Sequence, residues 1–217
     1  MKLLIVDDEE LTRTGVITSL DWASLGIDEV LQADDGVHGL ETARLCKPEI
    51  ILFDEAISSL DAHTQVQVMD LLRELKDRLG LTYIFITHDL GVVAELCDRV
   101  VVLYGGLVME EAEINDLFEN PLHPYTMGLL ASIPGLTKDK SERLQSIPGS
   151  PPDMTKPPKG CPFASRCQFA RNICAAECPP FVQVGSRQAR CWLLQPDAPA
   201  EGNPLHEKLA EAERKAH

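Results

Sequence analysis

The protein has 217 residues, of which 44% are hydrophobic and 25% charged, so its composition is that of a globular protein and excludes disorder over the whole length. The formal net charge of −14 argues against nucleic acid as the main partner, because phosphate backbones need a basic face. No apolar run approaches the roughly 20 residues of a membrane-spanning helix, and the acidic N-terminus is unlike a signal peptide. We therefore expect a cytoplasmic protein without a transmembrane segment of its own.

Composition changes along the chain. Residues 1–118 hold 24 acidic and 8 basic side chains, whereas residues 119–217 hold 10 and 12. Thirteen of the 15 prolines fall in residues 119–200, and five of the seven cysteines fall between Cys161 and Cys191. This change predicts an α/β domain over residues 1–118, an extension over residues 119–200 and a charged helical tail over residues 201–217.

The first region alternates apolar runs with helical patterns. The apolar runs predict five strands: Lys2–Val6, Glu29–Gln32, Ile50–Phe53, Tyr83–Thr87 and Arg99–Tyr104. Helical spacing predicts the segments between them: Glu10–Leu20, Gly36–Cys46, Thr64–Leu79 and Leu90–Cys97. This alternation is typical of a doubly wound parallel sheet that binds ligands at the carboxyl ends of its strands. The expected fold class is therefore α/β, with a five-stranded sheet and a Pro/Cys-rich C-terminal extension.

The second region does not continue this rhythm. Asn120–Tyr125 predicts a turn and Thr126–Ile133 a short helix. A proline-rich loop over Gly149–Lys159 precedes the cysteines, and Pro204–Ala216 predicts the helical tail. We find no internal repeat.

Acidic pairs follow two of the predicted strands. Asp7 and Asp8 come after the first, and Asp54 and Glu55 come after the third. If the two strands are neighbours, these carboxylates converge, and a cation would relieve their mutual repulsion. Oxygen-rich sites with room for water suit Mg²⁺. The alternative is that the acids only solubilise loops.

The first 54 residues resemble a response-regulator receiver domain. The resemblance rests on KLLIVDDEELTR, DW-x-x-LGI at Asp21–Ile27, ADDGVHGLE and KPEIILFD. It implies that Asp7 and Asp8 bind Mg²⁺, that Asp54 accepts a phosphoryl group with Thr87 ending the next strand, and that the strand order is 2-1-3-4-5. A receiver also has a Lys after its fifth strand, where this chain has Gly105-Gly106.

From Ile50 onward the chain resembles a different family. IILFDEAISSLDAHTQVQVMDLL is similar to the Walker B and D-loop segment of an ABC-transporter ATPase, and THDLGVVAELCDRVVVLYGGLVME is similar to its switch-histidine segment. NPLHPYTMGLLASIPG and the cysteines that follow resemble the C-terminal extension of ATP-binding subunits of oligopeptide and dipeptide importers. Residues 1–118 would then combine a receiver-like part, 1–52, with an ATPase part, 50–118.

This second resemblance implies a role for each matching residue. Asp54 would hold Mg²⁺ through water, Glu55 would be the general base, and His88 would contact the γ-phosphate of ATP. Ser59, Leu60 and Asp61 would form the D-loop that faces a second ATP-binding subunit. Membrane permease subunits would be the other partners, which would place the protein on the inner face of the cell membrane.

Neither resemblance is complete. No G-x-x-x-x-G-K-[ST] and no LSGGQ-type signature occurs in the sequence, so the groups that cradle the phosphates are not in this chain. Three functions stay open: an ATP-binding subunit of a peptide importer represented by its C-terminal half, a phosphorelay receiver with Asp54 as acceptor, and a non-catalytic metal-binding module.

The cysteine segment has the spacing C-x5-C-x6-C-x3-C-x12-C. Disulfides are disfavoured in a reducing cytosol, so a soft metal site is the better interpretation. The importer family has Cys at the positions of Cys161, Cys167, Cys174 and Cys191, and some of its members hold a [4Fe–4S] cluster there. The resemblance therefore favours such a cluster, and an empty site stays open. Four thiolates also suit Zn²⁺. Cys178, next to Pro179-Pro180, is expected to be dispensable.

Overall fold

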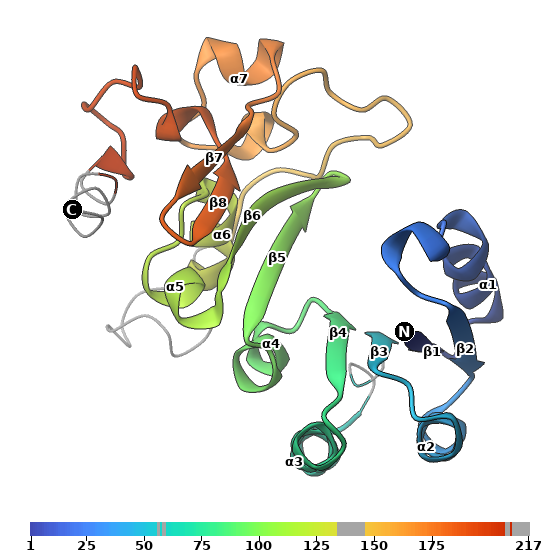
Figure 1. Ribbon diagram of the computed structural model, residues 1–217. Helices are drawn as coiled ribbons and strands as arrows, with labels where there is room; N and C mark the ends of the chain where they lie inside the picture. The colour runs from blue at the N-terminus through green and yellow to red at the C-terminus, as the bar shows by residue number, and fades with distance from the viewer. Residues whose placement is uncertain (56, 58–59, 134–145, 207–208, 210–217) are drawn as a thin grey trace. The chain divides into compact units, whose positions relative to one another are not determined.

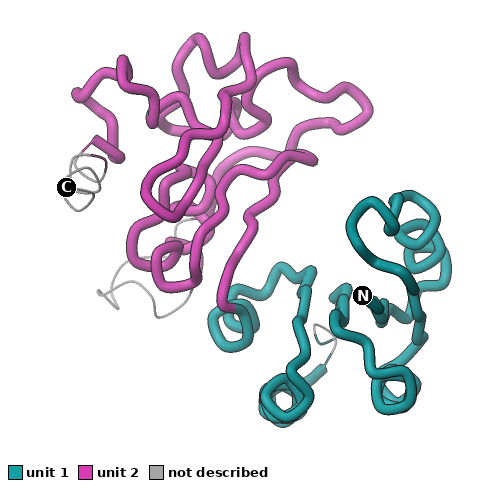
Figure 2. The backbone as a smooth tube through the Cα atoms, in the orientation of Figure 1, with its two compact units in different colours: residues 1–97 teal, residues 98–217 magenta. Residues whose placement is uncertain are grey.

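The computed structural model describes residues 1–55, 57, 60–133, 146–206 and 209. The chain forms two compact units, residues 1–97 and 98–217 (Figure 2). The change in composition near residue 118 therefore falls inside the second unit. Most of the tail helix expected over Pro204–Ala216 lies outside the described residues, as does Ser59, which was expected to belong to a D-loop.

The first unit contains a parallel sheet of four strands in the order β2-β1-β3-β4. The strands are β1 (Lys2–Val6), β2 (Glu29–Ala33), β3 (Ile50–Asp54) and β4 (Thr82–Ile86). Its helices are α1 (Glu10–Ser19), α2 (Gly36–Cys46), α3 (Ala62–Leu79) and α4 (Leu90–Leu96), with a 3₁₀ turn at Ala23–Leu25 (Figure 1). The expected order is confirmed for these four strands.

Alternating side chains of the central strands bury both faces of this sheet. Leu4, Val6 and Ile51 pack with Ala43 of α2 on one face, whereas Leu3, Ile5 and Leu52 pack with Trp22 and the partly buried side of α1 on the other. Strands buried on both faces read as continuous apolar runs, which is why KLLIV and IILF were recognisable in the sequence.

The prediction that the parallel sheet has a fifth strand is wrong. Arg99–Tyr104 is indeed a strand, β5, but it pairs antiparallel with β6 (Leu107–Glu113) in the second unit. The two-residue connection Gly105-Gly106 has φ values of +56° and +73°. Positive φ at both positions is what a tight antiparallel hairpin requires, and a parallel crossover cannot be made with two residues.

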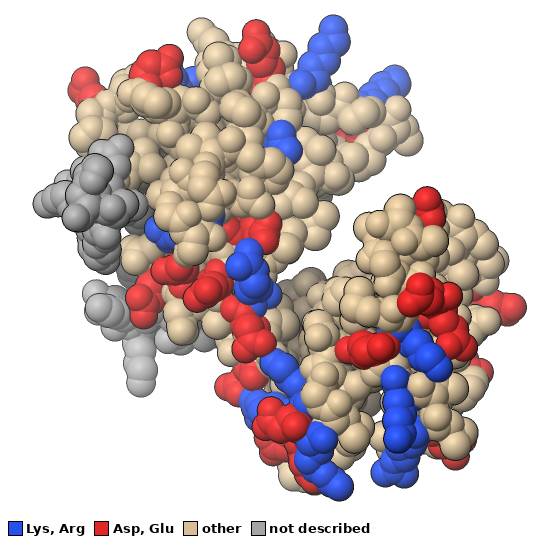
Figure 3. All heavy atoms as spheres, in the orientation of Figure 1, with Lys and Arg blue, Asp and Glu red and all other residues tan. Residues whose placement is uncertain are grey.

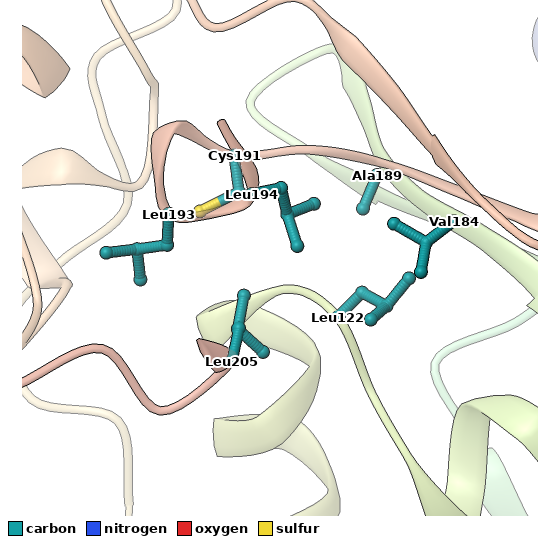
Figure 4. Close-up of a cluster of buried hydrophobic side chains, with 7 residues drawn as sticks. All are labelled: Leu122, Val184, Ala189, Cys191, Leu193, Leu194 and Leu205. Atoms are coloured by element: carbon teal, nitrogen blue, oxygen red, sulfur yellow. The ribbon is translucent and has the colours of Figure 1, made fainter. Parts of the chain in front are cut away.

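The second unit is built on an antiparallel sheet in the order β5-β6-β8-β7, completed by β7 (Phe181–Val184) and β8 (Arg187–Arg190). Its helices are α5 (Ile114–Glu119), α6 (Pro124–Ala131) and α7 (Asn172–Ala176), with 3₁₀ turns at Ala164–Arg166 and Trp192–Leu194. Figure 4 shows one of its cores, in which Leu122 and Leu205 face Val184, Leu193 and their neighbours. The cysteine segment therefore shares an apolar core with the rest of its unit.

Charged side chains of both signs are interspersed on the face of the molecule in view, over elements of both units (Figure 3). None of the helices in the described part of the chain is long and apolar enough to cross a membrane.

Candidate functional site

The carboxyl ends of β1 and β3 bring two of the expected acids together. The register of the strands pairs Val6 with Phe53, so Asp7 and Asp54 follow at adjacent positions. Asp7 is only 7% exposed, and Asp54 is partly buried. Burial raises the pKa of Asp54, and the neighbouring carboxylates of Asp7 and Glu55 raise it further.

Asp7 and Asp8 have different surroundings although they are adjacent. An oxygen of the Asp7 carboxylate accepts a hydrogen bond from the backbone N–H of Glu9 at 2.8 Å, and Arg13 donates to the backbone carbonyl of Asp7 at 2.7 Å. These contacts fix Asp7 at the start of α1. The side chain of Asp8 is exposed. The structure thus brings Asp7 to Asp54, while Asp8 faces solvent.

Glu55 and His88 meet across the ends of β3 and β4. The register pairs Asp54 with Ile86, and the N–H of Glu55 donates to the carbonyl of Ile86 at 2.9 Å. An oxygen of the Glu55 carboxylate lies 2.9 Å from Nδ1 of His88. This contact raises the pKa of His88 above its usual value, through the hydrogen bond first and the charge of Glu55 second.

The backbone at Glu55 adopts an uncommon conformation. Its φ of +48° lies in the left-handed region, which non-glycine residues rarely adopt. Residues held in this conformation are often found at functional sites. The turn of the chain at this point places the Glu55 side chain beside the next strand. Asp54, Glu55 and His88 therefore form one open cluster at the carboxyl edge of the sheet.

Other expected residues take structural roles. Asp61 caps α3 by accepting from the N–H groups of His63 and Thr64, both at 3.1 Å. The hydroxyl of Thr87 accepts from the N–H of Asp89 at 3.0 Å, so it belongs to the turn before α4. Leu60 packs partly buried against the core between α3 and α4.

Sequence reasoning missed the role of Asp89. Its carboxylate accepts from the N–H of Gly91 at 2.8 Å and from the side chain of Gln65 at 3.2 Å, which connects the N-terminus of α4 to α3. An Asp directly before a helical run is a recognisable N-cap signal. By capping α4, Asp89 fixes the turn that carries His88.

A second candidate site lies in the other unit. One pocket is lined by four of the cysteines together with aromatic and apolar side chains: Cys161, Cys167, Cys174, Cys191, His123, Pro124, Phe163, Ala164, Phe169, Pro179, Trp192 and Leu193. Cys178 is not among them, and its sulfur lies 3.8 Å from a guanidinium nitrogen of Arg190. Four cysteines selected from the sequence thus line one pocket, whereas Cys178 lies near Cys161 but outside the lining.

The cysteine loops approach each other closely. The N–H of Cys161 donates to the carbonyl of Cys174 at 2.8 Å. A side chain at Gly160 would place its Cβ 2.3 Å from that same carbonyl oxygen, so only glycine fits there. The segment around Cys161 is therefore held against α7 by backbone contacts.

Burial makes the thiols of Cys161 and Cys191 harder to deprotonate than an ordinary cysteine. Burial raises the pKa of Cys161 to about 11 and that of Cys191 to about 12. Within the described ranges, no group of three or more His, Cys, Asp or Glu has the arrangement of a metal site. The structure therefore shows four cysteines lining one pocket. It gives no further support for the expected iron–sulfur cluster or zinc ion.

His123 lines this pocket from the turn before α6. It is 1% exposed, and its Nδ1 accepts from the N–H of Tyr125 at 3.0 Å. Burial lowers the pKa of His123 to about 4, so the ring is neutral at physiological pH. The fully buried carboxylate of Glu110 accepts from the N–H groups of Leu122 and His123 at 2.6 and 3.0 Å, which docks the turn on β6.

Comparison with protein families identifies the C-terminal part of the chain. Residues 109–174 match the family described as "Oligopeptide/dipeptide transporter, C-terminal region". The chain is 44% identical over 158 residues to the oligopeptide transport ATP-binding protein OppD of Bacillus subtilis, covering 72% of this chain and 44% of that protein. It is 43% identical over 164 residues to the dipeptide transport ATP-binding protein DppD of Caldanaerobacter subterraneus, covering 75% of this chain and 48% of that protein.

A third relative, the dipeptide transport ATP-binding protein DppD of Lactococcus lactis, is 47% identical over 154 residues, covering 70% of this chain and 44% of that protein. The chain thus spans a little under half the length of these curated relatives. The resemblance to ATP-binding subunits of ABC transporters is confirmed, on a part of their length.

Solved structures resemble the chain only weakly. A two-component transcriptional regulator from Clostridium phytofermentans is 34% identical with a TM-score of 0.31, covering 39% of this chain and 64% of that chain. The chemotaxis response regulator CheY4 of Vibrio cholerae is 23% identical with a TM-score of 0.30, and the match covers 41% of this chain and 68% of that chain. The receiver resemblance recurs among structural neighbours, but scores this low carry no argument about function.

Proposed function

We propose that this chain carries the hydrolytic side of the nucleotide site of an oligopeptide or dipeptide importer, as the C-terminal half of an ATP-binding subunit. The observation that carries the proposal is the 2.9 Å contact between Glu55 and His88 beside Asp54. It lies in a chain whose relatives are peptide transport ATP-binding proteins.

In this proposal each residue has one task. Glu55 is the general base that orients the attacking water, and His88 contacts the γ-phosphate while its Nδ1 stays on Glu55. The oxygens of Asp54 and Asp7 suit a hard cation, and the pKa of Asp54 is raised by burial first and by the nearby carboxylates of Asp7 and Glu55 second. Mg²⁺ would be held by Asp7 and, through a water molecule, by Asp54. The cation would neutralise part of the negative charge of the phosphates.

The proposal includes a limit. The sequence contains no phosphate-binding loop, so this chain alone holds nucleotide weakly and does not turn it over. Residues 59–61, of which Ser59 lies outside the described residues, would face a second ATP-binding subunit. Permease subunits would be the membrane partners, and the protein would lie on the cytoplasmic side of the membrane.

A receiver function is the second candidate, because the strand order β2-β1-β3-β4 places Asp7 beside Asp54. Asp54 would then accept a phosphoryl group, with Mg²⁺ held by Asp7 and Asp8. The displacement of β5 into the other sheet weighs against it, since the sheet lacks the strand that carries the receiver's Lys. Acetyl phosphate separates the candidates: a receiver gains one phosphoryl group on Asp54, and the importer function predicts no labelling.

The thiol pocket suits a soft metal, and we include it in the proposal as a structural site. Four cysteines line one apolar pocket, and four thiolates are a donor set that Zn²⁺ or a [4Fe–4S] cluster takes. In the described residues these side chains do not have the arrangement of a metal site, so binding would have to draw them together. Cys161, Cys167, Cys174 and Cys191 would bind as thiolates, and the cation would supply the charge that offsets their deprotonation. If neither nucleotide nor phosphoryl chemistry occurs, a metal-binding module is what remains.

The hydrolytic roles are tested by restoring the missing part. A hybrid that joins the N-terminal half of the Bacillus subtilis relative to residues 50–217 of this chain would contain a phosphate-binding loop. It would lack Asp7, so it tests Asp54, Glu55 and His88 without that residue. We expect the hybrid to hydrolyse ATP, and Glu55→Gln and His88→Ala to remove most of that activity while Cys178→Ser leaves it unchanged. Equal hydrolysis with Gln at position 55 would refute the assignment of the base.

A further inference from the structure

The two edges of the parallel sheet differ in chemistry. The edge strand β2 carries Glu29, whose carboxylate pairs with Lys2 at 3.1 Å, and the polar Gln32. The opposite edge strand, β4, has the sequence TYIFI, without a charged residue or a proline. Natural sheets usually protect an edge with charge, proline or a bulge. The edge formed by β4 has none of these devices.

The hydrogen-bonding groups at this edge follow from the pairing of β4 with β3. The N–H of Thr82 donates to Glu49, and the carbonyl of Ile86 accepts from Glu55. In a parallel ladder alternate residues turn toward the same neighbour. The backbone groups of Tyr83 and Phe85 therefore point away from β3, and no strand of the described residues pairs with them.

The side chains of β4 also divide by face. Tyr83 and Phe85 pack with Phe53 toward α3 and α4. On the other face Ile84 is 45% exposed and Ile86 is 47% exposed. An unpaired, uncharged edge with two exposed isoleucines has the properties of edges to which another strand can add.

We propose that β4 pairs antiparallel with β4 of a second copy of this chain, about a two-fold axis at Ile84. In this register Tyr83 lies opposite Phe85 of the partner, and the two residues exchange both backbone hydrogen bonds on each side of the axis. Ile84 lies opposite itself as a non-hydrogen-bonded pair, and Thr82 lies opposite Ile86.

The strand is self-complementary in this arrangement. The outward backbone groups of Tyr83 and Phe85 are satisfied, no charges meet, and the aromatic face of one sheet continues into the other. A two-fold contact of this kind closes on itself, so it yields a dimer and not a filament. The absence of charge favours a second copy over a charged peptide as the occupant.

The register gives a sharp test. Opposite residues of a non-hydrogen-bonded pair have Cα atoms about 4.5 Å apart, within the range of a disulfide. The variant Ile84→Cys in the full chain should give a covalent dimer on mild oxidation, above the background of the seven native cysteines. The matched control is Ile86→Cys, which is equally exposed and lies opposite Thr82, and it should not.

Two further measurements complete the test. The parent chain should sediment as a concentration-dependent dimer under reducing conditions, and Ile84→Lys should be monomeric with a far-UV spectrum like the parent's. A parent chain that stays monomeric up to hundreds of micromolar would overturn the proposal. Equal cross-linking of the two cysteine variants would overturn the register at Ile84.

Discussion

Nδ1 of His88 lies 2.9 Å from a carboxylate oxygen of Glu55, although 33 residues separate the two in sequence. The contact depends on the pairing of β3 with β4 and on the positive φ of Glu55. Both side chains are largely exposed, so the pair contributes little to stability. The contact orients the imidazole ring of His88. The carboxylate of Glu55 holds Nδ1, so Nε2 is the ring nitrogen that can contact another group.

Mg²⁺ should stabilise the first unit through Asp54 and Asp7. Because the cation binds the folded site and not the unfolded chain, the midpoint of thermal unfolding should rise with Mg²⁺ concentration. The variant Asp54→Asn should lose most of that rise, whereas Asp61→Asn, which changes only the cap of α3, should keep it. An undiminished rise in Asp54→Asn would place the cation elsewhere.

Removal of one pocket cysteine should differ from removal of Cys178. If the pocket holds a soft metal, Cys191→Ser should lose bound iron or zinc and expose the segment to protease, because binding a metal also stabilises the fold. Cys178→Ser should retain both metal and protease resistance. Metal analysis after anaerobic purification checks this, and metal-free protein in which both variants behave alike would contradict the metal interpretation.

Glu110 should be required for the turn that carries His123. Replacing it with Leu leaves the buried N–H groups of Leu122 and His123 without an acceptor, which should cost about 2–4 kcal/mol of unfolding free energy. The neighbouring Glu111→Gln, which alters a partly exposed pair with Arg99, should cost less than about 1 kcal/mol. Urea unfolding measures both, and equal losses would show that Glu110 does not dock the turn.

Strands β1 and β3 could be predicted because they are largely buried on both faces, whereas the strand order followed from the resemblance to a receiver domain. The wrong prediction for β5 shows that an apolar run does not reveal which sheet a strand joins. The run RVVVLY suits a parallel or an antiparallel sheet equally well, and the signal that distinguishes them is the Gly105-Gly106 turn after it. The hairpin of β7 and β8 was missed because FVQV and RQAR are short and half polar.

The candidate sites were predictable residue by residue, and their geometry was not. Asp54, Glu55 and His88 could be named from the sequence, but the contact of Glu55 with His88 requires the strand register and the backbone angle at Glu55. The approach of the Cys161 segment to Cys174 likewise depends on the close backbone contact at Gly160, which no spacing reveals.

The pairing of Glu55 with His88 is tested most directly by the pH titration of the His88 ring, followed by nuclear magnetic resonance. A pKa raised in the folded state means that the pair supports folding at low pH and that this support is lost as the pH rises through the folded pKa. We expect a pKa of His88 above the ordinary value of about 6.5, falling toward it in Glu55→Gln. The same pKa in the parent and in Glu55→Gln would contradict the account.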